Sequence, residues 1–127
     1  MKKILLVDDS KVVAKLLSDK LSEKGYAVIA CSDVDSAIAA YKENELGIGL
    51  VITDLIMPGK DGNDLIDFLH KDSVPGSRPK IMVISGGSKG TVTGETAVQS
   101  VQNRVEMVMV KPFKPEELVN AVNLLLS

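Results

Sequence analysis

Several features on which whole classes of protein depend are scarce or missing in this sequence. Cys31 is the single cysteine in 127 residues, so an internal disulfide is impossible and nothing points to secretion. No apolar run reaches the roughly 18 residues that a membrane-spanning helix needs. The two lysines near the start lead directly into a short apolar run, Ile4–Val7, which is too brief for a signal peptide. These absences predict a cytoplasmic protein without a membrane anchor.

Aromatic residues and excess charge are also scarce. Aromatics make up 3% of the chain, so the core must consist of Val, Ile, Leu, Met and Ala. The formal net charge is −2, and no basic patch of the kind that binds nucleic acid through phosphates is visible. The length and the 45% hydrophobic content suit one globular domain over residues 1–127, so direct nucleic-acid binding is not expected.

What the sequence does contain is a repeated pattern of apolar runs and helical stripes. Strands are predicted at residues 2–7, 26–30, 50–53, 80–84 and 105–110. Helices are predicted over residues 11–24, from a cap at Ser32 to about Asn44, over 63–71, over 95–103, and from Pro115 onward. The predicted inward face of the first helix includes Leu16. Five βα units in succession predict an α/β fold: a doubly wound, flavodoxin-like (βα)5 domain whose five-stranded parallel sheet has helices on both faces.

The strands share a second feature, which is a polar residue where the apolar run stops. Asp8 and Asp9 follow the first strand, Asp54 follows the third, Ser85 the fourth and Lys111 the fifth. The carboxyl ends of parallel strands meet at one end of a sheet, where ligands of such folds bind. Any one of these residues alone reads as a cap, a turn residue or a surface lysine. Their common position predicts a site.

Three carboxylates at one place need a counter-charge. Two of them about 4 Å apart repel by roughly 4 kcal/mol at an effective dielectric of 20, so Asp8, Asp9 and Asp54 cannot all be ionised together without a cation. Hard oxygen ligands favour Mg²⁺. With the amine of Lys111 and the hydroxyl of Ser85, the set fits phosphoryl transfer to a free carboxylate.

The motifs resemble those of response-regulator receiver domains of two-component signalling, most closely the chemotaxis single-domain type. They are VDDS at Asp8–Asp9, DLIMPGKDG from Asp54, VISGG at Ser85 and KPF from Lys111, in order and over nearly the whole chain. The resemblance implies that Asp54 accepts phosphate from a sensor histidine kinase or phosphotransfer protein. The chain would then be a signalling module rather than an enzyme, catalysing only its own phosphorylation and dephosphorylation.

The resemblance also implies how the site is arranged and used. Asp9, Asp54 and the backbone carbonyl of Ile56 would ligate Mg²⁺, while Asp8 would act through water. The Lys111–Pro112 peptide bond would be cis. Phosphorylation would switch an output surface on the fourth helix, fifth strand and fifth helix, read by a downstream protein or a fused output domain.

The sequence departs from the receiver pattern in two places. Val108 stands where receivers usually carry the rotating switch aromatic, three residues before the lysine. The segment between Ser85 and Lys111 is also glycine-rich and a few residues long, so its helix can differ from the family's.

Three other functions compete with the receiver. A non-phosphorylated interaction domain on the same fold usually lacks one of the acids or the lysine, and both kinds of residue are present here. A Mg²⁺-dependent phosphohydrolase needs a second acid and a cap over the substrate, for which the chain has no room. An FMN-binding flavodoxin needs a phosphate loop after the first strand, where this chain has two acids.

Overall fold

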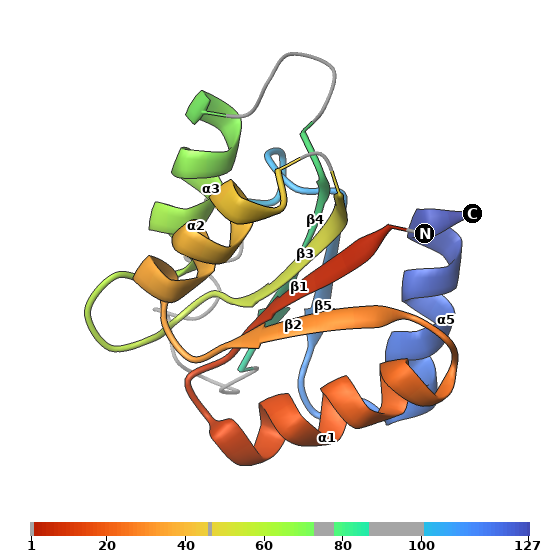
Figure 1. The fold of residues 1–127 in the computed structure, drawn as a ribbon. Helices are drawn as coiled ribbons and strands as arrows, with labels where there is room; N and C mark the ends of the chain where they lie inside the picture. Colours follow the sequence, from red (N-terminus) through yellow and green to blue (C-terminus); the bar gives the residue numbers. More distant parts are fainter. Residues whose placement is uncertain (1, 46, 73–77, 87–100) are drawn as a thin grey trace.

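The computed structural model describes residues 2–45, 47–72, 78–86 and 101–127, and these form one parallel sheet with helices on both faces (Figure 1). The strands are β1 (Lys3–Val7), β2 (Ala27–Cys31), β3 (Ile48–Asp54), β4 (Lys80–Ser85) and β5 (Met107–Val110). The helices are α1 (Lys11–Glu23), α2 (Val34–Glu43), α3 (Gly62–Asp72) and α5 (Pro115–Leu126). The strand order is β2-β1-β3-β4-β5, all parallel, so the doubly wound α/β prediction is confirmed.

The core has two halves, one on each face of the sheet. Because side chains alternate along a strand, Leu5 and Val51 pack toward α2 and α3, while Ile4 and Leu50 pack toward α1 and α5. All seven residues of β3 are buried, as expected for a central strand covered on both faces. This rigid strand carries Asp54 at its carboxyl end.

Several local predictions need correction. Leu16 is 56% exposed, and Ala14 joins Leu17 and Leu21 on the buried face of α1 in its place. Asp33 rather than Ser32 caps α2, since its carboxylate accepts a hydrogen bond from Ser36 N at 2.7 Å. The fifth strand begins at Met107 instead of residue 105. Most of the helix predicted at 95–103 lies outside the described residues.

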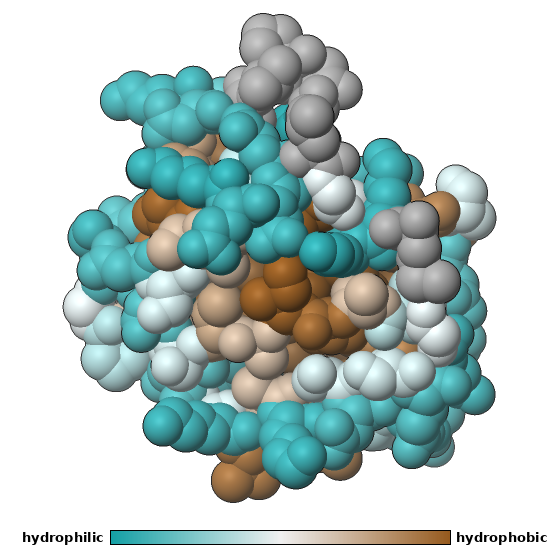
Figure 2. All heavy atoms as spheres, viewed as in Figure 1, coloured by the Kyte–Doolittle hydropathy of each residue, from teal (hydrophilic) through white to brown (hydrophobic). Residues whose placement is uncertain are grey.

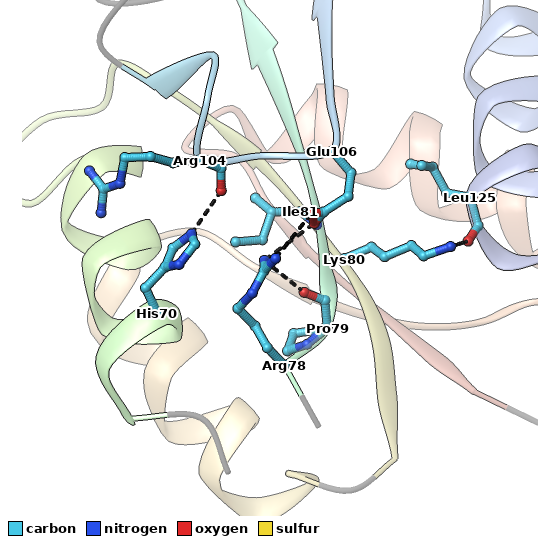
Figure 3. A network of polar contacts seen from close by, with 8 residues as sticks. All are labelled: His70, Arg78, Pro79, Lys80, Ile81, Arg104, Glu106 and Leu125. Carbon is cyan, nitrogen blue, oxygen red and sulfur yellow. Dashed lines mark hydrogen bonds and ion pairs between the residues drawn. The ribbon is translucent and has the colours of Figure 1, made fainter. Parts of the chain in front are cut away.

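The amino ends of β4 and β5 are joined by a polar network (Figure 3). The two terminal guanidinium nitrogens of Arg78, Nη1 and Nη2, each lie 3.2 Å from a carboxylate oxygen of Glu106. The same carboxylate accepts a hydrogen bond from Ile81 N at 2.9 Å. Lys80 donates to the Leu125 carbonyl of α5 at 2.6 Å. At this end of the sheet, the charged side chains and the nearby backbone groups are therefore hydrogen-bonded to one another. Among the described residues, no helix is both long and apolar enough to cross a membrane.

Candidate functional site

The predicted acid cluster forms at the carboxyl end of the sheet. Val7 is paired with Thr53 in the β1–β3 register, so the next residue on each strand, Asp8 and Asp54, are neighbours. One carboxylate oxygen from each of Asp8, Asp9 and Asp54 lies within 4.8 Å of the others. Asp8 is 1% exposed and Asp54 7%, whereas Asp9 is open to solvent. Sequence reasoning therefore brought the right three acids together.

The electrostatics of the cluster are unbalanced. Burial of Asp54, together with the adjacent carboxyl group of Asp8, raises the pKa of Asp54 to about 7, although the nearby Lys111 ammonium acts in the opposite direction. Asp8 Oδ1 accepts a hydrogen bond from Ser10 N at 2.8 Å. Its other oxygen, Oδ2, is buried without a hydrogen-bond partner among the described residues. A buried acceptor of this kind is costly unless something else satisfies it.

The lysine and the hydroxyl come from the two neighbouring strands. Lys111 N donates to the carbonyl of Ser85 at 2.9 Å, which fixes the two strand ends together. Lys111 Nζ lies 3.3 Å from Asp54 Oδ1 and 3.8 Å from Asp8 Oδ2. Ser85 is 6% exposed at the end of β4. The Lys111–Pro112 bond is cis, as the resemblance implied.

The loop after Asp54 depends on a glycine that sequence reasoning did not single out. A Cβ on Gly62 would lie 2.5 Å from the Asp54 carbonyl oxygen and 2.9 Å from Leu55 Cα, closer than real Cβ contacts. Gly62 N also donates to the Leu55 carbonyl at 2.8 Å. Asp61 caps α3, accepting a hydrogen bond from Asn63 N at 2.9 Å. The start of α3 is thus held directly against the backbone of the site, and the Asp61-Gly62 dipeptide was the available signal.

Four of the grouped residues, Asp9, Asp54, Ser85 and Lys111, line a cavity of about 320 Å³. Its lining consists of Asp9, Asp54, Ile56, Ile84, Ser85, Gly86 and Lys111. The space has carboxylates on one side and an ammonium on another, which suits a divalent cation beside a phosphoryl group. The unsatisfied Asp8 oxygen and the all-oxygen donor set fit such an ion, so the residues present match a hard-metal site.

Val108 lies close to this site but not in it. It is half-buried, pairs with Val83 of β4 and packs against the core on the α2 and α3 face. No aromatic ring occupies this position, in agreement with the sequence. The neighbouring residues 87–100, on which part of the expected output surface falls, lie outside the described residues.

Comparison with known proteins gives a consistent result. The family model described as "Response regulator receiver domain" matches residues 4–123. The transcriptional regulatory protein ResD of Bacillus subtilis is 33% identical over 124 residues, a match that covers 98% of this chain and 48% of ResD. The chain spans about half the length of the first curated relatives that it matches.

Solved structures agree on the architecture. NtrX from Brucella abortus is 30% identical with a TM-score of 0.81, covering 98% of this chain and 26% of that one. The chemotaxis protein CheY4 of Vibrio cholerae has a TM-score of 0.78 at 23% identity, with 98% of each chain covered. The second likeness bears on the fold alone.

Proposed function

Since the chain belongs to the response regulator receiver domain family of two-component signalling, we propose that Asp54 is its phosphoacceptor and that Lys111 and Ser85 assist the transfer. One observation carries this proposal. Asp54 is a buried carboxylate at a strand end, 3.3 Å from the Lys111 ammonium and beside two further acids. A carboxylate in this position is a nucleophile with an ammonium group beside it and oxygen ligands for a cation close by.

The proposed reaction is transfer from a phosphohistidine. An oxygen of Asp54 attacks phosphorus, an O–P bond forms, and the P–N bond to the donor histidine breaks, with the electron pair and then a proton going to the histidine nitrogen. Lys111 moves from pairing with Asp54 to pairing with a phosphoryl oxygen, and the Ser85 hydroxyl donates to another. The cavity of about 320 Å³ leaves room for the group beside both side chains.

A magnesium ion is part of this proposal. Asp9, Asp54 and the backbone carbonyl of Ile56 would hold it, with Asp8 acting through water. When bound, the ion would neutralise charge on the acids and on the transferring phosphoryl group. The protein's own contribution is to hold three carboxylates together at the ends of two strands, where their mutual repulsion favours the binding of a cation.

The proposed partners follow from the same premise. A sensor histidine kinase or phosphotransfer protein in the cytoplasm would supply the phosphoryl group. A downstream protein, or an output domain if the chain is part of a longer protein, would read the phosphorylated state through the surface around β5 and α5.

Phosphorylation by a small-molecule donor tests the assignment. The protein is incubated with acetyl phosphate and Mg²⁺ and weighed by intact-mass spectrometry, with Asp54→Ala, the isosteric Asp54→Asn and the matched surface control Asp72→Asn alongside. The wild type and Asp72→Asn should each gain one phosphoryl group, and both Asp54 variants none. A gain that survives at Asp54→Ala would refute the assignment, and rapid turnover of phosphate esters would favour a phosphohydrolase instead.

A further inference from the structure

The β2 strand is an outer strand of the sheet with unusually little protection. Natural proteins shield such strands with charge, proline or a covering element, because their unpaired backbone groups attract other strands. Residues 27–31 read Ala-Val-Ile-Ala-Cys, with neither charge nor proline. Ala27 and Ala30 are exposed and the other three are half-buried.

The outer side of β2 is open to solvent. Figure 2 shows an apolar area in the middle of the face where β2 runs in Figure 1, bordered by hydrophilic residues. Helix α1 packs on one face of β2, and a cavity of about 390 Å³ lies between Ala14 and Ser18 of α1 and Ala30 and Cys31 of the strand. The backbone edge of β2 that faces away from β1 is not paired with another strand among the described residues.

The backbone groups that face outward can be identified from the ladder. Asp8 N donates to the Cys31 carbonyl at 3.1 Å, so Cys31 faces β1. Backbone groups alternate sides along a strand, so Ala27 and Ile29 also face β1, while Val28 and Ala30 direct their N–H and C=O groups away from the sheet. Two residues thus present four unpaired backbone groups.

These four groups match themselves in one antiparallel register. When Ile29 of one copy lies opposite Ile29 of a second copy, Val28 faces Ala30 and Ala30 faces Val28, and each pair exchanges two hydrogen bonds. A shift of this register by two residues would pair Ala30 with Tyr26, whose N–H is already bonded to the Leu21 carbonyl at 3.2 Å. The side chains facing each other would be apolar and mostly small.

The charges at the ends of β2 fit the same arrangement. Lys24, before the strand, is exposed and has no ion-pair partner among the described residues, while its neighbour Glu23 lies 4.0 Å from Lys20. Asp33, after the strand, is also exposed. An antiparallel pair brings the Lys24 end of β2 in each copy next to the Asp33 end of the other, so opposite charges approach each other at both ends of the pair about the two-fold axis.

We propose that β2 is a self-association surface, through which two copies of this chain pair antiparallel about Ile29 to form one continuous ten-stranded sheet. Four backbone hydrogen bonds and a short apolar strip make a small interface, so the dimer is weak and its population depends on protein concentration. Neither the phosphoacceptor nor its metal takes part, so this surface stands apart from the proposed phosphorylation.

Disulfide trapping tests the register directly. The pairing sets Ala27 opposite the second copy's Cys31 in a non-hydrogen-bonded pair, with Cα atoms about 4.5 Å apart, within the range of a disulfide. Ala27→Cys should therefore form a covalent dimer under mild oxidation. Ala39→Cys, an exposed site on α2, is the matched control and should stay at background. Peptide mapping must find a 27–31 link, because a 31–31 link would refute this register.

A charge reversal tests the same dimer without cysteine chemistry. Lys24→Glu would place like charges beside each other at both ends of the pair, so its sedimentation coefficient should rise less with concentration than that of the wild type. Lys71→Glu on α3 makes the same charge change away from β2 and should behave as the wild type. If the wild type stays monomeric over roughly a hundredfold range of concentration and Ala27→Cys gives only background dimer, the proposal is wrong.

Discussion

The two ends of the sheet differ in how their charged groups are buried and paired, because Arg78 and Glu106 are exposed whereas Asp8 and Asp54 are buried. At the amino ends of β4 and β5, Glu106 meets both nitrogens of Arg78 and the backbone N–H of Ile81, so its carboxylate is fully engaged. At the carboxyl ends, a buried oxygen of Asp8 has no hydrogen-bond partner within the described part of the chain, and the pKa of Asp54 is raised to about 7 by burial and by Asp8. The charged groups at the first end are paired with one another, whereas the acids at the second end lack a full set of hydrogen-bond and charge partners within the described residues.

This difference separates a structural ion pair from a functional one. Lys111 is the cation that faces the acids, and it lies 3.3 Å from one carboxylate and 3.8 Å from another, so its single charge is shared. An arrangement selected only for stability would match each acid with its own partner, as at Glu106. The imbalance at Asp8 and Asp54 is therefore the physical sign of a site that binds something further.

Removal of Lys111 should have the largest effect on the comparison, because Lys111 is the cation that pairs with Asp8 and Asp54 among the described residues. We expect Lys111→Met to slow phosphorylation by acetyl phosphate about 10²-fold, the usual cost of losing one group that stabilises transition-state charge. The rate is followed by intact-mass spectrometry in saturating Mg²⁺. Arg78→Met removes a cation from the opposite end and should leave that rate within about twofold of the wild type. Equal slowing in both variants would contradict the division between the two ends.

Substitution of Gly62 should disturb the acidic end through its backbone. The Cβ of Gly62→Ala would lie 2.5 Å from the Asp54 carbonyl oxygen, so the loop must move, at a cost of about 1–3 kcal/mol in unfolding free energy. Gly86→Ala is the matched control, since no atom of the described residues lies within 4 Å of the added Cβ. Urea unfolding measures both. An unchanged urea midpoint for Gly62→Ala would mean that α3 and the Asp54 loop can move apart to accept the Cβ without loss of stability.

The sequence was sufficient for the fold and the acid cluster because both depend on patterns that are local. An apolar run that ends in an acid specifies a buried strand and a polar residue at its carboxyl end, so Asp8, Asp9, Asp54 and Lys111 could be grouped without coordinates. Other features depend on contacts between distant residues. The pairing of Arg78 with Glu106 has no local pattern, and the Asp61-Gly62 dipeptide marks a turn without showing how closely Gly62 approaches Asp54, so both contacts were missed.

Helix faces and caps were the weaker part for a related reason. Leu16 continues an apolar stripe in the sequence, yet it is exposed, because the packing of α1 on β2 and α5 decides which of several apolar residues turns inward. Ser32 and Asp33 are both good caps, and only the extended backbone of Asp33 selects it. Propensity cannot decide between neighbours of similar preference.

The smallest predicted effect is the most direct test of the comparison. Replacing a carboxylate by an amide should change the unfolding free energy in opposite directions at the two ends of the sheet. Asp54→Asn removes a crowded charge, so in EDTA at about pH 8 it should raise the unfolding free energy by about 1–2 kcal/mol. Glu106→Gln removes a matched charge and should lower it by about 1 kcal/mol. Urea unfolding is repeated with Mg²⁺, which should stabilise the wild type and Glu106→Gln but have much less effect on Asp54→Asn. If Asp54→Asn destabilised the metal-free protein, the negative charge of Asp54 would already be compensated by other groups of the protein, and the acids would not need a bound cation.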